Sequence, residues 1–371
     1  MRKVALDLGA RKTSYCEVQD GQVIQRATVT SVETLESLLG PEHPPADVAI
    51  EACREAWHVH DLLSSWGNRV VLVDTTRSRR LGIGQHGRKT DKIDAEVLAL
   101  ALERGGIPVA HVLSPHRREL RRWLNVRRAL VESRAQLVTT SRGLAREQGV
   151  QLPRCPTANF LRHTSKLTMQ PLEVIAPLLK LLETVNAELA VVDAKLAVMC
   201  ETEPVVKLLM TAPGVGPTVA ASFVSVVDDA KRFQSPHHVE SYLGLVPSED
   251  SSGGKRRLGA ISKKGNSYLR SLLVQGAWSI LTKGDRHDPL RLWTEAVAER
   301  RSKKIAVIAL ARRLAGVLWA MWRDSKPYNP ALLASASGRG TRENARALQA
   351  QAIKLTATAR KRVPMEATLQ T

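Results

Sequence analysis

The strongest constraint on how this chain can fold is the order of β-rich and helical patterns in its first 103 residues. Five short β-rich runs occur at residues 3–8, 13–18, 22–30, 47–51 and 69–74. Helical patterns occur at residues 32–39, 56–66 and 90–103. Asp20-Gly21 separates the second and third runs, and this dipeptide is typical of a hairpin between antiparallel strands. The order β-β-β-α-β-α-β-α predicts an α/β domain whose sheet begins with a hairpin.

Four acidic residues occupy informative positions in this predicted domain. Asp7 lies in the first strand, Glu51 ends the fourth strand, and Asp91 and Asp94 open the last helix. Residues three apart share a helix face, so the last two carboxylates can point at one site. Clustered carboxylates repel one another unless a cation lies between them, and Mg²⁺ is typically bound by carboxylates, phosphate oxygens and water. The pattern predicts a magnesium site, although Asp91 and Asp94 could instead only complement the helix dipole.

The chain is strongly basic. Its 371 residues include 55 Lys and Arg against 36 Asp and Glu, which gives a formal net charge of +19. Such an excess predicts a polyanionic partner, and nucleic acid is the first candidate. No membrane partner is expected, because Arg312 and Arg313 interrupt the most apolar segment. No signal-peptide core follows Met1 and no Cys-x-x-Cys occurs, so we expect a cytoplasmic protein with reduced thiols.

Two basic segments in the first half of the chain are predicted to contact a phosphate backbone. The first lies between the last strand and the last helix of the predicted domain, and its candidate residues are Arg77, Arg79, Arg80, Arg88 and Lys89. The second, residues 116–147, holds nine Arg against three Glu and reads as one long helix. Its candidate contacts are Arg117, Arg118, Arg121 and Arg122. The alternative for this helix is an ordinary solvated charged face.

Two further helical features follow. Residues 172–200 have an apolar periodicity that predicts a coiled or dimer-forming helix. Pro213-Gly214-Val215-Gly216-Pro217 then joins two helical patterns, and Pro217 suits the first turn of the second helix. This pattern predicts a helix-hairpin-helix in which N–H groups around Gly214 and Gly216 face a phosphate. The alternative is a plain turn between two helices.

Two serines followed by two glycines, Ser251-Ser252-Gly253-Gly254, precede a basic run. Glycine lacks a Cβ, so its backbone N–H groups can approach a phosphate oxygen closely. The candidate phosphate contacts that follow are Lys255, Arg256, Arg257, Lys263 and Lys264. The residues suit a phosphodiester, although the same pattern is also typical of a flexible surface turn.

In combination, these motifs resemble the DEDD-type transposases of bacterial insertion sequences. The resemblance rests on the four acids and Pro-Gly-Val-Gly-Pro, together with Tyr-Leu-Gly-Leu-Val-Pro, Ser-Ser-Gly-Gly-Lys and Ile-Ser-Lys-Lys-Gly-Asn-x-x-Leu-Arg. It covers nearly all of the chain except the C-terminal tail. It implies an RNase H-like (RuvC-like) domain at residues 1–112 and a basic helical and coiled-coil linker at 113–203. A mainly helical transposase domain at 204–330 and a basic tail at 331–371 would follow.

The resemblance also implies roles for individual residues. Asp7, Glu51, Asp91 and Asp94 would hold Mg²⁺, and a serine of the Ser-Gly motif would be the nucleophile. Ser252 is the preferred serine because it directly precedes Gly253, and Ser251 is the alternative. Family members recombine donor and target DNA chosen by a structured bridge RNA, as dimers that assemble into a tetramer. These partners are therefore expected here.

Two other functions remain open from the sequence. Asp7-Leu-Gly-Ala-Arg-Lys-Thr13 resembles the phosphate loop of actin-like ATPases and sugar kinases, but a second nucleotide-binding half is missing. The other alternative is a nucleic-acid-binding or junction-binding protein without catalysis. Metal-dependent strand cleavage would exclude the second, and ATP turnover without DNA would support the first.

Overall fold

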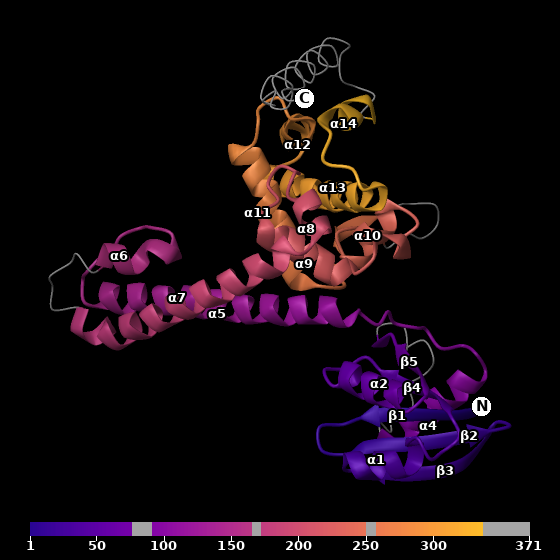
Figure 1. The fold of residues 1–371 in the computed structure, drawn as a ribbon. Helices are drawn as coiled ribbons and strands as arrows, with labels where there is room; N and C mark the ends of the chain where they lie inside the picture. The colour runs from indigo at the N-terminus through magenta and orange to yellow at the C-terminus, as the bar shows by residue number, and fades with distance from the viewer. Residues whose placement is uncertain (76–90, 165–171, 250–256, 337–371) are drawn as a thin grey trace, which may run out of the picture. The chain divides into compact units, whose positions relative to one another are not determined.

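The computed structural model describes residues 1–75, 91–164, 172–249 and 257–336 (Figure 1). Two compact units are present, Met1–Leu113 and Ser114–Thr371, here called unit 1 and unit 2. The finer division of residues 114–371 into a linker, a transposase domain and a tail stays a prediction.

Unit 1 is a mixed α/β structure built on one five-stranded sheet. Its strands are β1 (Arg2–Leu8), β2 (Thr13–Gln19), β3 (Gln22–Val29), β4 (Ala46–Glu51) and β5 (Arg69–Val73). Their order across the sheet is β3-β2-β1-β4-β5, with β1, β2 and β3 antiparallel and β1, β4 and β5 parallel. The helices are α1 (Val32–Leu39), α2 (Ala56–Ser65) and α4 (Asp91–Glu103). The predicted order of strands and helices is confirmed in the part of unit 1 that the structure describes.

The turn between β2 and β3 shows why this hairpin is readable from sequence. Asp20 and Gly21 have φ angles of 52° and 75°. Two successive positive φ angles define the tight turn that matches the twist of paired strands, and Asp followed by Gly tolerates them well. The local sequence therefore favours the tight turn that pairs β2 with β3.

Each face of the sheet is covered by helices. One face packs Val4, Leu6, Tyr15, Val48, Ile50 and Leu72 against α1 and α2. The opposite face packs Ala5, Cys16, Val18, Ala49 and Val73 against α4. Side chains alternate between faces along a strand, so consecutive residues of β1 and β4 belong to different cores. Unit 1 thus has three layers, helix on sheet on helix.

An ionic cluster holds the amino-terminal end of β4. Asp47, which is 2% exposed, accepts hydrogen bonds from Arg69 Nε and Lys3 Nζ, each at 2.5 Å. These bonds, with the Arg69 bond the largest cause, lower the pKa of Asp47 to about 2. The cluster joins β1, β4 and β5 where the parallel strands begin.

The Asp47 cluster predicts a pH dependence of stability. Asp47→Asn should lower the free energy of unfolding by about 1 to 3 kcal/mol at pH 7, less than for a fully buried pair because Arg69 is largely exposed. A lowered folded-state pKa contributes stability above the unfolded value of about 3.9, and this is lost as the pH falls toward 2. Urea unfolding between pH 3 and 7 measures the difference between native protein and variant.

That difference should be constant from pH 5 to 7 and shrink below pH 4. Glu42→Gln, at an exposed carboxylate nearby in sequence, is the control and should change little. A difference between Asp47→Asn and native protein that is the same at pH 3 and pH 7 would contradict the assignment.

Unit 2 begins with a long helical hairpin. α5 (Pro115–Glu147) and α7 (Leu172–Glu201) pack along each other, and the short helices η2 (Thr157–Asn159) and α6 (Phe160–Thr164) lie near the distal end (Figure 1). The buried stripe of α7 consists of Ile175, Leu182, Val185, Leu189, Val192 and Leu196. The predicted helices at 116–147 and 172–200 are confirmed. The apolar stripe of α7 faces α5 of the same chain, so an intramolecular partner accounts for it.

The remainder of unit 2 is a helical body with one small hairpin. Its helices are α8 (Pro204–Leu209), α9 (Pro217–Val227), η3 (Ala230–Arg232), α10 (Pro236–Tyr242), α11 (Ser267–Lys283), α12 (Pro289–Arg300), α13 (Lys303–Asp324) and α14 (Pro330–Ala336). The hairpin pairs β6 (Pro247–Glu249) with β7 (Leu258–Ile261). These helices share one core that also receives Leu120 and Leu124 of α5.

α13 is the core helix of this body. Among the described helices, it alone is long and apolar enough to cross a membrane, and 56% of its most apolar window is buried inside the protein. Leu310, Leu314, Leu318 and Trp319 are at most 1% exposed within the shared core. The apolar character of α13 is thus explained by packing against the other helices of unit 2.

Candidate functional site

Two of the predicted acids lie side by side on the unit 1 sheet. In the parallel pairing of β1 with β4, Leu6 is opposite Ile50, and one residue further the same register brings Asp7 beside Glu51. Ala5 and Ala49 face α4, so the two-residue period of a strand directs Asp7 and Glu51 to that same face. Both acids are partly buried.

The direction of α4 brings the other two acids to the same end of the sheet. Glu103, at the carboxyl end of α4, accepts a hydrogen bond at 3.0 Å from the backbone N–H of Gly21. Gly21 lies in the β2–β3 turn, which adjoins the start of β1 because Lys3 pairs with Val18. α4 therefore runs antiparallel to β1, and its first turn, with Asp91 and Asp94, lies toward the carboxyl end of β1.

A second contact fixes the position of α4 along the sheet. Glu96 forms an ion pair at 2.5 Å with Arg26 of the edge strand β3, and Arg26 is opposite Cys16, which lies near the middle of β2. Asp94 is 7% exposed. The side chain of Asp91 lies outside the described set. Among the side chains that are described, no three His, Cys, Asp or Glu groups lie together closely enough to hold a metal ion.

Two features beside Asp7 were missed by the sequence interpretation of the acids. Ser14 is opposite Asp7 in the β1–β2 pairing and is 6% exposed, so a buried hydroxyl adjoins the acid. The signal was available, because Ser14 continues the two-residue period of Cys16 and Val18. The β1–β2 turn also presents exposed Arg11 and Lys12 at this end of the strand.

The loop between α8 and α9 is tied to α11 by backbone contact. Gly214 has a φ of 70°, and a Cβ placed on it would collide with the carbonyl oxygen of Gly276. A Cβ on Gly276 would in turn lie 2.8 Å from the carbonyl oxygen of Gly214. Gly214 is thus required for packing. Gly216 is different, because it is the N-cap residue just before α9, has a φ of −91°, and a Cβ there would meet open space.

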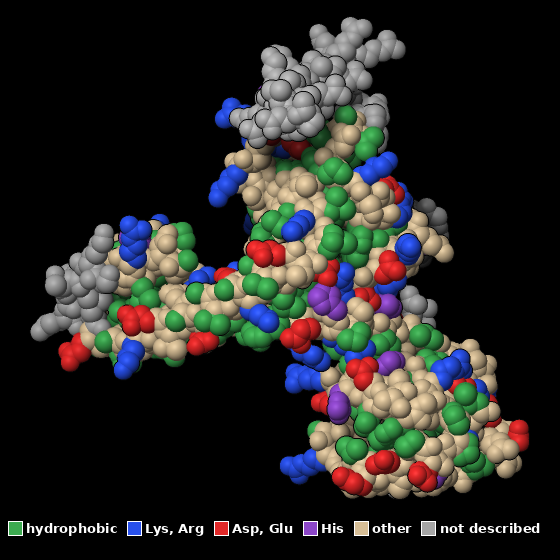
Figure 2. All heavy atoms as spheres, in the orientation of Figure 1, with side chains coloured by type: hydrophobic (Ala, Val, Ile, Leu, Met, Phe, Trp, Pro, Cys, Tyr) green, Lys and Arg blue, Asp and Glu red, His purple; other side chains and the backbone are tan. Residues whose placement is uncertain are grey.

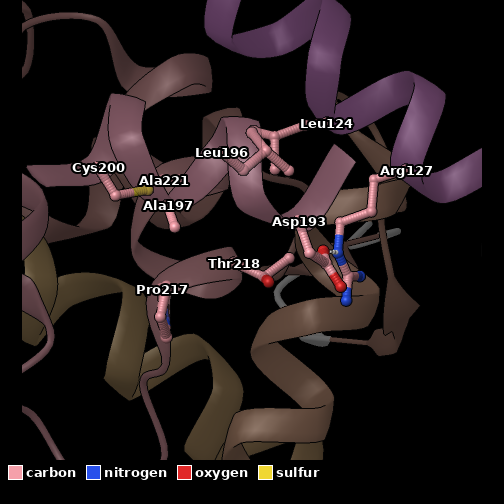
Figure 3. Close-up of a pocket in the computed structure, with 9 residues that line it drawn as sticks. All are labelled: Leu124, Arg127, Asp193, Leu196, Ala197, Cys200, Pro217, Thr218 and Ala221. Carbon is pink, nitrogen blue, oxygen red and sulfur yellow. Dashed lines mark hydrogen bonds and ion pairs between the residues drawn. The ribbon is translucent and has the colours of Figure 1, made fainter. Parts of the chain in front are cut away.

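A small pocket adjoins the first turn of α9 (Figure 3). Its volume is about 200 Å³, and its lining residues are Leu124, Arg127, Asp193, Leu196, Ala197, Cys200, Pro217, Thr218 and Ala221. Arg127 Nε donates to Asp193 at 2.6 Å, and this bond joins α5 to α7 at the pocket. The guanidinium therefore already has a carboxylate partner.

A rigid basic loop follows the β6–β7 hairpin. Lys263 and Gly265 have positive φ angles of 55° and 73°, and the N–H of Lys263 donates to the carbonyl of Gly244 at 3.1 Å. Arg270 donates to the carbonyl of Leu243 at 3.1 Å from the helix that follows. The side chains of Lys263 and Lys264 are exposed, as is Arg257 at the start of β7.

Comparison with known proteins assigns the family. Residues 4–147 match the family described as Transposase of the DEDD IS110 type, and residues 206–290 match the Transposase IS116/IS110/IS902 family. A protein of Sinorhizobium fredii described as a transposase is 30% identical over 78% of this chain and 76% of its own length. The chain belongs to the IS110/IS116 family of insertion-sequence transposases.

Other relatives agree. A probable family 20 transposase of Pseudomonas aeruginosa is 29% identical over 77% of this chain and 87% of its own length. The transposase for insertion sequence element IS1111A of Coxiella burnetii is 28% identical over 76% of this chain and 79% of its own length. The expected transposase family is confirmed. The chain is therefore not assigned to the actin-like ATPases and sugar kinases.

The first turns of α5 in this transposase use several arginines for packing. Arg117 forms an ion pair with Glu203 at 2.6 Å, and Arg118 is only 4% exposed. Burial lowers the pKa of Arg121. Arg122, with its side chain 66% exposed, is the predicted contact in this group that faces solvent, beside Glu119 at 3.2 Å. Arg118 in particular is enclosed by the fold and is not presented to a phosphate.

Several predicted site residues of the transposase lie outside the described residues. They are Arg77, Arg79, Arg80, Arg88, Lys89, Ser251, Ser252, Lys255 and Arg256. Their proposed roles therefore remain predictions from the sequence.

The contact between Gly214 and Gly276 can be tested by adding one methyl group at Gly214. Gly214→Ala should lower the free energy of unfolding by about 2 to 4 kcal/mol, because the methyl meets the Gly276 carbonyl and alanine disfavours a positive φ. Gly216→Ala is the matched control, and it should change stability by less than about 1 kcal/mol. Thermal or urea unfolding measures both, and equal stabilities of the two variants would refute the packing role of Gly214.

Proposed function

We propose that this transposase cuts and rejoins DNA strands with a magnesium-dependent carboxylate site in unit 1. The observation that carries the proposal is the placement of Asp7 beside Glu51 on one face of the sheet, at the end toward which the first turn of α4 points. Asp7 and Glu51 come from two neighbouring strands, and the helix that carries Asp91 and Asp94 starts toward the same end of the sheet, which supports a shared role for the four acids. If Asp91 and Asp94 only complemented the helix dipole, α4 would not need to start toward the end of the sheet that carries Asp7 and Glu51.

We propose further that unit 1 is an RNase H-like domain of the RuvC-like kind. Three antiparallel strands followed by two parallel strands, in the order β3-β2-β1-β4-β5 with helices on both faces, support this assignment. The central strand β1 and its neighbour β4 carry the first two acids. Ligands in such sheets bind at the carboxyl ends of parallel strands, which agrees with the positions of both.

The donor set fits a hard divalent cation. Carboxylate oxygens suit Mg²⁺, which needs only one or two protein carboxylates when phosphate oxygens and water complete its shell. Asp7, Glu51, Asp91 and Asp94 are the residues that would hold it. When bound, the ion would stabilise negative charge on the oxygens of a phosphoryl displacement. Ser14 would lie next to Asp7 and orient its carboxylate, and Arg11 and Lys12 would attract the DNA backbone to this end of the sheet.

The nucleophile is proposed to be Ser252. The described strands β6 and β7 pair Glu249 with Leu258, and Ser251 and Ser252 lie between these two positions in the sequence. The Oγ of Ser252 would attack a DNA phosphorus and form an Oγ–P bond, while the bond from that phosphorus to one deoxyribose oxygen breaks. The serine proton passes to a base, and the departing oxygen takes up a proton. Arg257, Lys263 and Lys264 would neutralise phosphate charge.

The partners proposed are donor and target DNA, a structured bridge RNA, and further copies of the chain as a dimer and tetramer. The formal charge of +19 supports a polyanionic partner. The cytoplasm, where DNA is accessible in a bacterium, is the proposed location. A non-catalytic junction-binding protein is the remaining alternative, and the two tests below distinguish it.

Asp7→Asn should reduce magnesium-dependent cleavage of DNA by at least about 100-fold, because a ligand that stabilises developing charge is lost. Asp20→Asn is a matched control. It makes the same change in charge in the β2–β3 turn, at the opposite end of the sheet, and asparagine tolerates the positive φ there. Cleavage and recombination are measured at saturating Mg²⁺. Native rates in Asp7→Asn would remove the metal assignment.

Ser252→Ala should abolish recombination and the covalent protein–DNA adduct on a denaturing gel, because the attacking oxygen is gone. Ser251→Ala is the control and should retain both. An adduct that vanishes only in Ser251→Ala would transfer the role to Ser251. An adduct that survives in the double variant would end the serine hypothesis.

A further inference from the structure

The distal end of the α5–α7 hairpin contains a hollow that the proposed function leaves unused. Its volume is about 300 Å³, and it lies between the last turns of α5 and the segment that follows them. The lining residues are Arg142, Arg146, Val150, Gln151, Leu152 and Arg154. We call it the tip pocket. Figure 1 shows α6 over this end of the hairpin, and Figure 2 shows both basic and acidic side chains on its surface there.

The charge of the tip pocket is unbalanced. Its lining includes three arginines and no acid. Residues 142–164 hold four Arg against a single acid, Glu147. Three guanidinium groups that share one hollow repel each other unless an anion lies among them. In the described part of the chain, none of the three pocket arginines forms an ion pair.

Other arginines of α5 form ion pairs with acidic side chains. Arg117 pairs with Glu203, Arg127 with Asp193, and Arg128 with Glu132. Each of these acids lies within 3 Å of its arginine, so the charges of these three arginines are balanced. The three arginines of the tip pocket have no such partner among the described residues.

Arg142 forms the fixed wall of the pocket. Its Nη2 donates to the carbonyls of Pro153 and Cys155, both at 3.0 Å, and its guanidinium lies 5.2 Å from the Phe160 ring centre. These contacts hold the segment after α5 against the helix. Its buried Nε has no hydrogen-bond partner among the described atoms.

Arg146 and Arg154 are exposed and line the hollow from two different segments, one from α5 and one from the segment that follows it. A guanidinium can offer two parallel N–H donors to a phosphate. The volume is at the small end of the range for ligand pockets, which suits one phosphate with its attached sugar. Two arginines can thus contact one phosphate from two directions.

We propose that the tip pocket binds a phosphate of a nucleic-acid backbone and anchors an arm of the nucleic acid away from the helical body. Arg142 lies 12 residues beyond Leu130, the last α5 residue that packs against the body core, which is about 18 Å along the helix. The proposal rests on the proposed function only in that the partner is a nucleic acid. DNA and RNA present the same phosphodiester, and the test distinguishes them.

The test uses full-length protein with Arg146 and Arg154 both changed to Gln. Binding of a labelled DNA duplex and of a labelled RNA hairpin is measured without Mg²⁺ over a series of salt concentrations. Affinity for the anchored nucleic acid should fall about tenfold, and the salt slope should fall by about 0.9 for a duplex phosphate or about 0.7 for a single-stranded one. The probe that loses affinity identifies the source of the phosphate.

Arg300→Gln with Arg301→Gln is the matched control, because it removes two exposed charges at the end of α12. If Arg146 only complements the dipole at the end of α5, the tip variant lowers the unfolding midpoint and leaves both salt slopes native, which overturns the proposal. Equal losses in the tip and control variants overturn it as well. Because no cleavage is required, these outcomes are independent of the carboxylate and serine tests.

Discussion

The packing of α4 across the centre of the unit 1 sheet is the interaction on which the candidate active site depends. Ala5 and Ala49 on the strands and Ala95 and Ala99 on the helix are all fully buried in one cluster. Small side chains on both surfaces let the helix approach the strands closely. Since the Glu103 contact at the far end fixes the direction of α4, its first turn lies toward the carboxyl end of β1. The placement of the acids therefore follows from core packing.

In unit 2, glycines allow backbone segments to approach each other closely, whereas in unit 1 alanines allow α4 to approach the sheet. Gly214 and Gly276 bring the α8–α9 loop into backbone contact with α11, and Gly244 does the same for the loop that carries Lys264. Both loops thereby become part of the rigid helical body. In the basic loop, the exposed Lys263 and Lys264 thus belong to a backbone segment that is held against Gly244.

Local signals explain which features could be predicted from the sequence. Asp20-Gly21 and the apolar periodicity of each segment gave the elements of unit 1, and α1 begins and ends where the pattern does. The packing partners of a side chain are not local. Arg118 reads as one more cation of a basic helix, yet helices much later in the chain help to enclose that part of α5. Gly214 reads as a phosphate contact, yet its position is explained by Gly276.

The difference between local sequence signals and packing partners also affects what the net charge of the chain indicates about nucleic-acid binding. A formal charge of +19 counts every cation equally, but a cation with a carboxylate partner gains little from a phosphate because it must exchange one anion for another. Along α5, ion pairs and burial occupy arginines near the body, including Arg117, Arg118 and Arg127. Arg142 and Arg146 at the distal end lack acidic partners among the described residues. The arginines of α5 are therefore not equivalent, although the sequence alone presents them as one basic series.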